Sequence, residues 1–316
     1  MAEKNYIISL IHLLKNNIEC INCINQSLHV RGYAFIRLDE KFVSLIDESL
    51  SEMENFFTLD INSKRKYFKA PIFGYFDVPH KESFRILTGS RLKEHLFPES
   101  FNKIKFLINI MDKIMYRIVT ILKPYVFANR EITKNIPLLK ENNRWGMFDV
   151  AKYNNNHLEM KCKEHFDPGL LSLSLRSTQH GLQLKNEYGE WIDPPRDKNI
   201  AILWTGDAAV KINPLLKHGI HRVINKSNIH IPRIAMWYEI CTFQQEHREL
   251  LNDKINKNMK DIKYIPKKFE NDTGIPFSKI IGHPQSPYKI NDDNKNYNKH
   301  MIQPYYSNIS KNLYSL

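Results

Sequence analysis

The pattern that most constrains this chain is an alternation of apolar and polar residues in its second half. Over residues 171–176 three leucines alternate with two serines and an arginine, and residues 182–184 repeat the pattern. Successive residues of a strand point to opposite faces of a sheet, so a period of two predicts β-strands. Further runs at 200–204 and 234–240 continue the series, with no helical pattern between them. Many short strands joined by turns indicate an antiparallel sandwich or barrel, and we expect a jelly roll, the double-stranded β-helix.

The first half of the chain follows a helical period instead. A short strand is expected over 32–38, and Asp39 is a suitable N-cap for the helix that follows it. Apolar residues then recur at steps of three and four: Phe42, Leu45, Ile46, Leu50, Met53, Phe56 and Phe57. A second long helix is expected to begin at Ser100 as its N-cap and to stop at Pro124. The predicted fold class is therefore α+β, a jelly-roll core with a helix-rich N-terminal region packed on it.

Residues 60–89 connect these two helices and contain several prolines and glycines. Because aromatic residues are interleaved with them, we expect an ordered loop that walls a site. Phe84 and Arg85 in this loop are candidate substrate contacts. A packed connector without a role in binding is the alternative.

Three regions are expected along the chain. Residues 1–140 form the helix-rich region with its early strand, 141–246 the jelly-roll core, and 247–316 an extension rich in asparagine and lysine. Prolines punctuate the extension, so it either wraps over the core or is partly disordered.

Composition narrows the partners of this protein. The 316 residues carry 46 Lys plus Arg against 34 Asp plus Glu, a formal charge of +12. Lysine and asparagine are abundant throughout and no basic stripe stands out, so we do not expect a nucleic-acid partner. No run approaches the roughly 18 apolar residues of a membrane span, and the N-terminal apolar run reads as a short amphipathic helix, so no membrane partner is expected. The oligomeric state is left open.

Four cysteines suggest a reducing compartment. Cys20 and Cys23 form a lone CxxC without a second pair, which is a weak signal for a metal or redox site. Without a secretory signal, reduced thiols and a cytoplasmic location are expected.

One cluster of residue types carries chemistry. His165 and Asp167 are two apart, so on an extended strand they point to the same side. His221, from a later strand-like stretch, could complete a set of two imidazoles and one carboxylate. Such a set occupies one face of a metal ion and is typical of non-haem Fe(II) sites that activate oxygen. His218 lies three residues before His221 and is the competing third ligand.

The surroundings of this cluster resemble a known family. The segments HFDPGLLSLSL from His165, GLQLKNEYGEWIDPP from Gly181, Gly206-Asp207, His221-Arg222-Val223 and PRIAMWYE around Arg233 follow one another in the order and spacing of the 2-oxoglutarate and Fe(II)-dependent dioxygenases of the isopenicillin-N-synthase-like type. The resemblance extends over roughly residues 25 to 243.

The resemblance implies a function for several residues. His165, Asp167 and His221 would hold Fe(II), and Arg233 would bind the distal carboxylate of the cosubstrate 2-oxoglutarate. Tyr153 would assist Arg233. The family pattern is not complete: Ala235 stands where a serine is usual after the arginine, and Ala151 where an asparagine precedes the tyrosine.

The expected activity is oxidation, by hydroxylation or desaturation, of a C–H bond of a small molecule, with O2 and 2-oxoglutarate consumed. Two alternatives remain. The alanines at 151 and 235 also suit an Fe(II) oxidase that does not use 2-oxoglutarate. A metal-binding interaction module without turnover is the other.

Overall fold

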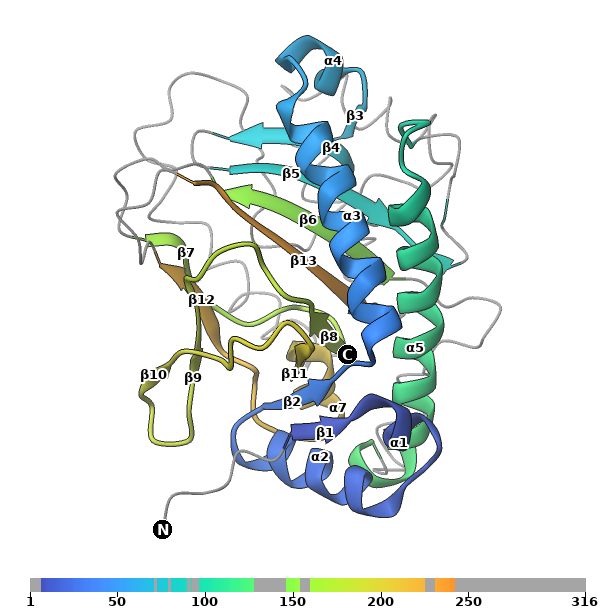
Figure 1. Ribbon diagram of the computed structural model, residues 1–316. Coiled ribbons are helices and arrows are strands. Elements are labelled where there is room, and N and C mark those ends of the chain that lie inside the picture. The colour runs from blue at the N-terminus through green and yellow to red at the C-terminus, as the bar shows by residue number, and fades with distance from the viewer. Residues whose placement is uncertain are drawn as a thin grey trace, which may run out of the picture.

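The computed structural model contains two β-sheets with their inner faces packed together (Figure 1). It describes residues 7–70, 73–78, 81–89, 92, 97–127, 146–153, 160–224 and 231–241. The large sheet has the strand order β1-β2-β11-β8-β13-β6-β5-β4-β3 and the small one β10-β9-β12-β7. Apart from the parallel pair β1 and β2, all these pairings are antiparallel. The two-sheet architecture predicted from the period of two is therefore present.

The strands are short, as their spacing in the sequence suggested. Those of the large sheet are β1 (Ile7–Ser9), β2 (Tyr33–Arg37), β3 (Phe68–Ala70), β4 (Phe73–Val78), β5 (Lys81–Leu87), β6 (Gly146–Tyr153), β8 (Leu171–Ser174), β11 (Ile200–Thr205) and β13 (Arg233–Ile240). Those of the small sheet are β7 (Met160–His165), β9 (Leu182–Lys185), β10 (Trp191–Ile192) and β12 (His221–Ile224).

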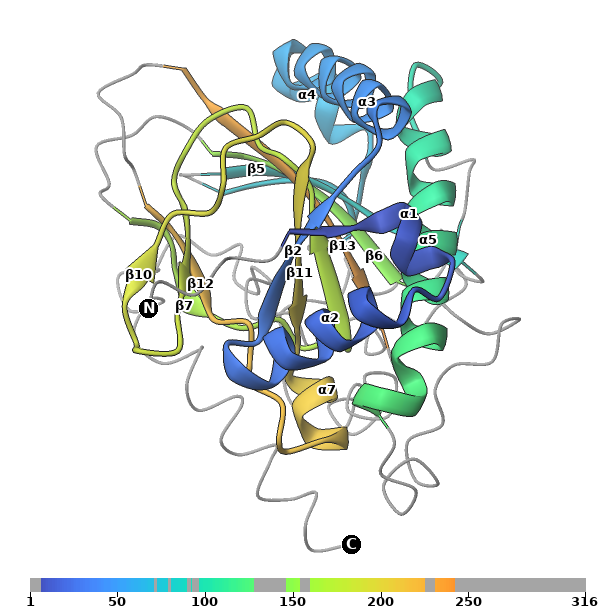
Figure 2. The same cartoon turned by 60° about the horizontal axis from the view of Figure 1, so that its bottom comes forward.

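Helices cover the outer face of the large sheet. Figures 1 and 2 show α3 and α5 side by side on that face, with α1 and α2 near one end of it. The helices are α1 (Leu10–Leu14), α2 (Ile18–Val30), α3 (Glu40–Thr58), α4 (Ile61–Arg65), α5 (Asn102–Val126) and α7 (Asp207–Ile212). None of the helices in the described part of the chain combines the length and the hydropathy needed to cross a membrane.

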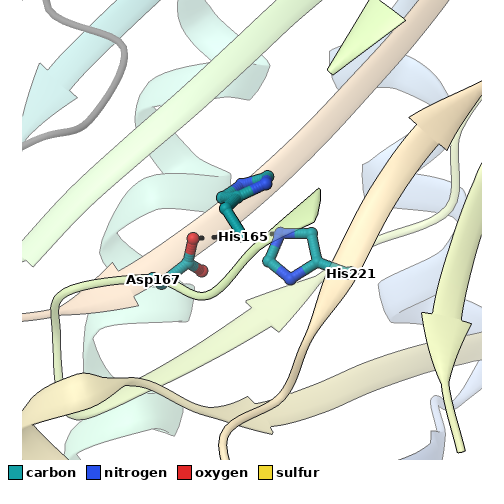
Figure 3. A group of neighbouring side chains, drawn as sticks. All are labelled: His165, Asp167 and His221. Atoms are coloured by element: carbon teal, nitrogen blue, oxygen red, sulfur yellow. Dashed lines mark ion pairs between the residues drawn. The ribbon is translucent and has the colours of Figure 1, made fainter. Parts of the chain in front are cut away.

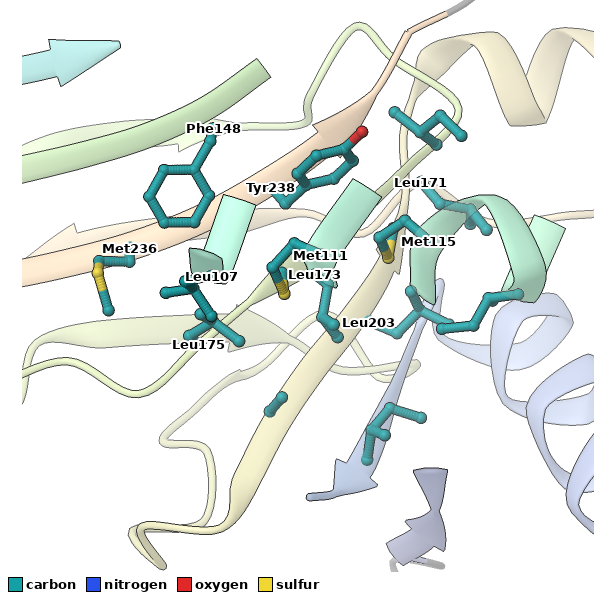
Figure 4. Packing of buried hydrophobic residues seen from close by; sticks show 14 of the residues in the cluster. Leu107, Met111, Met115, Phe148, Leu171, Leu173, Leu175, Leu203, Met236 and Tyr238 are labelled. Atoms are coloured by element: carbon teal, nitrogen blue, oxygen red, sulfur yellow. The ribbon is translucent and has the colours of Figure 1, made fainter. Parts of the chain in front are cut away.

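The alternation in β8 separates the main core from the inside of the barrel. Its leucines pack against methionines and leucines of α5, as Figure 4 shows. Ser172 and Ser174 lie on the opposite face and are also buried, because the small sheet covers them. Each leucine on the helix side contributes about 1.5–3 kcal/mol through burial. The serines make no such contribution, and their position toward the barrel interior suggests another role.

Both long helices lie where the sequence predicts them, with differences at the ends. The side chain of Asp39 accepts a hydrogen bond from the amide of Phe42 and caps α3, as expected. Ser100 does not cap α5: the helix begins after Phe101, and the carboxylate of Glu52 on α3 accepts the amides of residues 103 and 104. The predicted stop at Pro124 is also wrong, because α5 includes this residue and ends two residues later. A proline in the last turn lacks only one N–H bond, which the helix tolerates there.

The predicted loop at 60–89 is mostly regular structure, which corrects the sequence interpretation. It contains α4 and the strands β3, β4 and β5, and β5 pairs with β6 along its whole length. Phe84 packs on the helix side with Phe56 and Phe101, so it faces away from the barrel interior. Arg85 is on the opposite, inner face. The sequence pattern does not indicate β5 as a strand, because charged residues occupy both of its faces.

Two other expectations concern the ends of the chain. The predicted N-terminal helix is shorter than expected, because residues 7–9 form β1 and only 10–14 are helical. The extension 247–316 lies outside the described residues. The boundary at residue 140 stays a prediction, although strands from both sides of it join one sheet.

Candidate metal centre

Three side chains from neighbouring segments converge at one end of the small sheet (Figure 3). His165 is the last residue of β7 and His221 the first of β12, and the two are paired across the sheet. Asp167 follows β7 by two residues. Their potential ligand atoms all lie within 4.8 Å of one another, and Nε2 of His221 is 3.9 Å from Oδ1 of Asp167. The structure thus brings together the three residues that the sequence singled out.

Each imidazole is held by a backbone carbonyl. Nδ1 of His221 is 2.9 Å from the carbonyl oxygen of Gly219, and Nδ1 of His165 is 2.7 Å from that of Lys163. A carbonyl oxygen only accepts, so both Nδ1 atoms carry the proton in these bonds. Nε2 is then the nitrogen of each ring that remains to bind a metal ion, the arrangement typical of ligating histidines.

The carboxylate of Asp167 is oriented by two donors. The hydroxyl of Ser172 and the indole N–H of Trp204 donate to Oδ2, at 2.5 Å and 2.7 Å. Oδ1 is thereby left on the side of His221. Ser172 is the serine of β8 that faces inward, and its role explains a polar residue at a buried position.

The protonation states suit metal binding at two of the three groups. Burial and the nearby His165 lower the pKa of His221 to about 4, so this ring is neutral at pH 7. Burial raises the pKa of Asp167, but the histidines and the two donors outweigh it, so the pKa is lowered and the group is ionised. Burial lowers the pKa of His165, yet the neighbouring Cys162 and Asp167 raise it overall to about 9. A metal ion would have to displace that proton.

This donor set fits Fe(II). Two imidazole nitrogens and one carboxylate oxygen on a single side, with the remaining positions open toward a pocket, are typical of non-haem ferrous sites, and His165 would bind after losing its proton. A search of the histidine, cysteine and acidic side chains in the described residues finds these three as a group close enough together to hold a metal ion. Whether it binds iron stays a prediction.

The other histidines that the structure describes do not belong to this group. His218, the competing candidate, stacks on Phe166 with ring centroids 4.1 Å apart, and its Nε2 is 3.5 Å from Asp207. His180 is exposed, and His157 and His230 lie outside the described residues. Cys20 and Cys23 are free thiols on α2 that pack against the main apolar core.

A pocket extends from the metal centre into the barrel. Arg233 and Tyr153 lie directly opposite each other on β13 and β6, and both line it. Nε of Arg233 donates to the carbonyl of Gln179, whereas Nη1 is buried without a hydrogen-bond partner. Burial raises the pKa of Tyr153, so its hydroxyl keeps its proton. Ala151 and Ala235 form the next row and leave this part of the pocket without further polar groups on β6 and β13.

Sequence reasoning missed the residues that orient Asp167. The run at 200–204 indicates only a core or barrel-lining aromatic at Trp204, because nothing in the strand pattern marks its indole as a donor. The signal that could have indicated Ser172 is its inward position in a strand whose other face is apolar.

We expect Trp204→Phe to weaken Fe(II) binding about 10–100-fold. Phenylalanine keeps an aromatic side chain at this position but lacks the indole N–H that orients Asp167. Anaerobic calorimetric titration of Fe(II) measures this. Trp191→Phe, on the hairpin β9–β10, is the matched control and should bind like the wild type. Equal affinity of the Trp204 variant and the wild type would show that the indole does not orient the ligand.

Comparison with known proteins agrees with this geometry. Residues 144–242 match the 2OG-Fe(II) oxygenase superfamily. Three of the solved structures that share the fold illustrate this. A 2OG-Fe(II) oxygenase family protein of Caulobacter crescentus has 19% identity and a TM-score of 0.62, with 76% of this chain and 87% of that one covered. The dioxygenase for auxin oxidation 1 of Arabidopsis thaliana, solved with 2-oxoglutarate, has 14% identity and a TM-score of 0.62, with 75% and 93% covered. A Neurospora crassa protein solved with alpha-ketoglutarate and 5-formyluracil has 17% identity and a TM-score of 0.61, with 77% and 86% covered.

Residues 144–242, which include the three candidate metal ligands, thus match the 2OG-Fe(II) oxygenase superfamily, and proteins of the same fold have been solved with 2-oxoglutarate or alpha-ketoglutarate bound. The superfamily resemblance and the jelly-roll fold inferred from the sequence are confirmed.

Proposed function

We propose that this protein is an Fe(II)- and 2-oxoglutarate-dependent oxygenase in which His165, Asp167 and His221 hold the iron. The observation that carries the proposal is the convergence of the three ligands within 4.8 Å, each oriented by a separate hydrogen bond. Orientation of this kind is typical of functional metal sites, where the partners fix the ligand geometry before the ion arrives.

Arg233 and Tyr153 are proposed to bind the distal carboxylate of 2-oxoglutarate. The unpartnered Nη1 of Arg233 is a buried donor, and buried donors normally have acceptors. A carboxylate in the pocket would satisfy it, with the Tyr153 hydroxyl as a second donor. Since Ala235 adds no hydroxyl, Arg233 contributes a larger share of the affinity here than in a site with serine.

The residues around the site have separate roles. Fe(II), held by His165, Asp167 and His221, would supply the redox chemistry that consumes 2-oxoglutarate and O2. Trp204 and Ser172 keep the Asp167 carboxylate fixed, and Gly219 and Lys163 keep both imidazoles in the Nε2-binding form. The apolar wall of Leu182, Val223 and Ala235 limits water in the pocket.

The reaction is proposed to be hydroxylation or desaturation of a C–H bond of a small molecule, with conversion of 2-oxoglutarate and O2 to succinate and CO2. All four cysteines are free thiols. Because such thiols are typical of reducing compartments, we propose the cytoplasm as the location.

Replacing Arg233 by alanine is expected to raise the 2-oxoglutarate concentration for half-maximal succinate formation about 10–100-fold, as expected for the loss of hydrogen bonds to a charged group. The metal content should stay near one ion per chain. Arg37→Ala removes an exposed arginine of β2 and serves as the control.

Unchanged dependence on 2-oxoglutarate in the Arg233 variant would exclude this residue from the cosubstrate site. Oxygen uptake that requires no keto acid would instead favour the Fe(II) oxidase.

A further inference from the structure

Two side chains that line the pocket, Ser174 and Trp237, serve neither the metal centre nor the proposed cosubstrate site. Ser174 on β8 and Trp237 on β13 are directly paired, so their side chains leave the same face of the sheet. Figure 4 shows their chain neighbours Leu173 and Met236 among the residues of the opposite face, which packs against α5. Ser174 and Trp237 therefore form one continuous piece of the pocket wall.

Both side chains have groups that the described residues leave available. The hydroxyl of Ser174 is buried, and it donates to the carbonyl of the next residue at 3.4 Å, which is long for a bond between two oxygens. Within the described part of the chain, the indole of Trp237 has neither a hydrogen bond nor a ring contact. Trp237 is partly exposed. Because β13 is a central strand and Trp237 faces inward, its exposed part borders the pocket.

This pair lies at the metal end of the pocket. Ser172, which donates to Asp167, precedes Ser174 by two residues, or about 7 Å along a strand. Arg233 precedes Trp237 by four residues on β13, or about 13 Å. The pocket contains about 450 Å³ without protein atoms, part of it open to solvent, and sites for small molecules typically have roughly 300–1,000 Å³. A second molecule therefore has room beside a cosubstrate held at Arg233.

The remaining groups restrict what this part of the pocket can bind. Arg233 is assigned to the cosubstrate, and Asp167 and the two histidine ligands to the metal. The thiol of Cys162 lies 3.7 Å from Nδ1 of His165. In the described lining, no further arginine, lysine or acidic residue could balance a charge on a second molecule, and an unpaired buried charge is costly. The flat indole favours a planar ring, and the Ser174 hydroxyl can donate to or accept from an oxygen substituent.

We propose that Ser174 and Trp237 form the substrate subsite and that it takes a neutral, planar ring with a hydroxyl or carbonyl oxygen. The ring packs against the indole of Trp237, and its oxygen forms a hydrogen bond with the hydroxyl of Ser174. This assignment rests on the proposed function, because it places C–H bonds of the molecule beside the metal centre.

The test compares phenol with two neutral analogues that each lack one recognised feature. Cyclohexanol has the hydroxyl but is not planar, and toluene is planar but has no hydroxyl. Binding to the full-length protein loaded with Zn(II) and 2-oxoglutarate is followed by ligand-observed NMR, after calorimetry has shown that 2-oxoglutarate is bound. We expect phenol to bind about threefold or more tightly than either analogue, the effect of one hydrogen bond or one aromatic contact.

Each substitution should remove one of these preferences. Ser174→Ala should abolish the preference for phenol over toluene, and Trp237→Leu the preference for phenol over cyclohexanol. Trp237→Phe keeps an aromatic ring and should retain the latter. Ser174→Ala should leave the unfolding temperature and the 2-oxoglutarate affinity near those of the wild type, because the hydroxyl makes only one long hydrogen bond. Ser49→Ala is the matched control, because Ser49 is buried on α3 and outside the pocket lining, and it should keep both preferences.

Equal binding of phenol and its analogues to the wild type, no detectable binding of phenol, or a preference that survives its substitution would overturn the subsite, while 2-oxoglutarate binding upholds the proposed function. Absence of 2-oxoglutarate binding to the metal-loaded wild type would overturn the proposed function and the subsite with it.

Discussion

Replacing Asp167 by alanine is expected to abolish stoichiometric Fe(II) binding and with it all 2-oxoglutarate turnover. The substitution removes the anionic ligand and leaves two imidazoles, and loss of a ligand should cost more than the roughly 10–100-fold that loss of an orienting partner costs. The sheets should persist, because Asp167 lies in the segment after β7 and outside the apolar core. Metal content after anaerobic loading and desalting measures the effect.

The control for this substitution is Asp197→Ala, which removes an exposed aspartate from the turn before β11. It should retain one iron per chain. His221→Ala should behave like Asp167→Ala, because Nε2 of His221 is 3.9 Å from the Asp167 carboxylate. An Asp167 variant that still held one ion per chain would show that the metal lies elsewhere.

Replacing Glu82 by alanine is expected to cause the largest loss of stability, about 3–5 kcal/mol. Glu82 on β5 accepts hydrogen bonds from Lys64, Lys152 and Tyr75 at 2.5, 2.9 and 2.8 Å. This cluster ties α4 and the strands β4, β5 and β6 together. Without the carboxylate, two ammonium groups in a largely buried position would lose their counter-charge. The midpoint of urea unfolding measures the change.

The control is Asp77→Ala on β4, whose ion pair with Arg65 is largely exposed. Such pairs contribute about 0–1 kcal/mol, so this variant should unfold near the wild type. Equal unfolding midpoints of the two variants would contradict the assigned role of Glu82.

The difference in the free energy of unfolding between wild type and Glu82→Ala should also depend on pH. Burial raises the pKa of Glu82, but the bonds from Lys64, Lys152 and Tyr75 outweigh it, and the pKa is lowered. A lowered pKa in the folded state means that the stabilisation is fully present above the unfolded value of about 4.3. It is lost as the pH falls through the folded pKa. The difference between wild type and Glu82→Ala should therefore narrow below about pH 4.

The grouping of His165 with Asp167 could be predicted from the sequence because its signal is local. His165 and Asp167 are two residues apart, and a strand end places such residues on one side. The distance between His221 and His165 along the chain gives no geometry by itself, and the family resemblance supplied that pairing. The apolar stripe of α3 and the alternation in β8 likewise reflect one buried face each.

Features that depend on contacts distant in sequence were missed. β5 contains charged residues on both faces, and only the partners Asp149, Lys64 and Lys152 make their burial tolerable. The start of α5 depends on Glu52 from another helix. Sequence periodicity does not report such partners, so it predicts a loop at 60–89 and an N-cap at Ser100.

The central claim is that one ferrous site built from His165, Asp167 and His221 governs 2-oxoglutarate binding and turnover. Anaerobic titration of 2-oxoglutarate into protein with and without Fe(II), followed by exposure to O2 and measurement of succinate, tests it most directly. We expect tight binding only with Fe(II), and succinate formation in the wild type but not in Asp167→Ala. Binding that is the same without metal, or equal succinate formation by the variant, would contradict the claim.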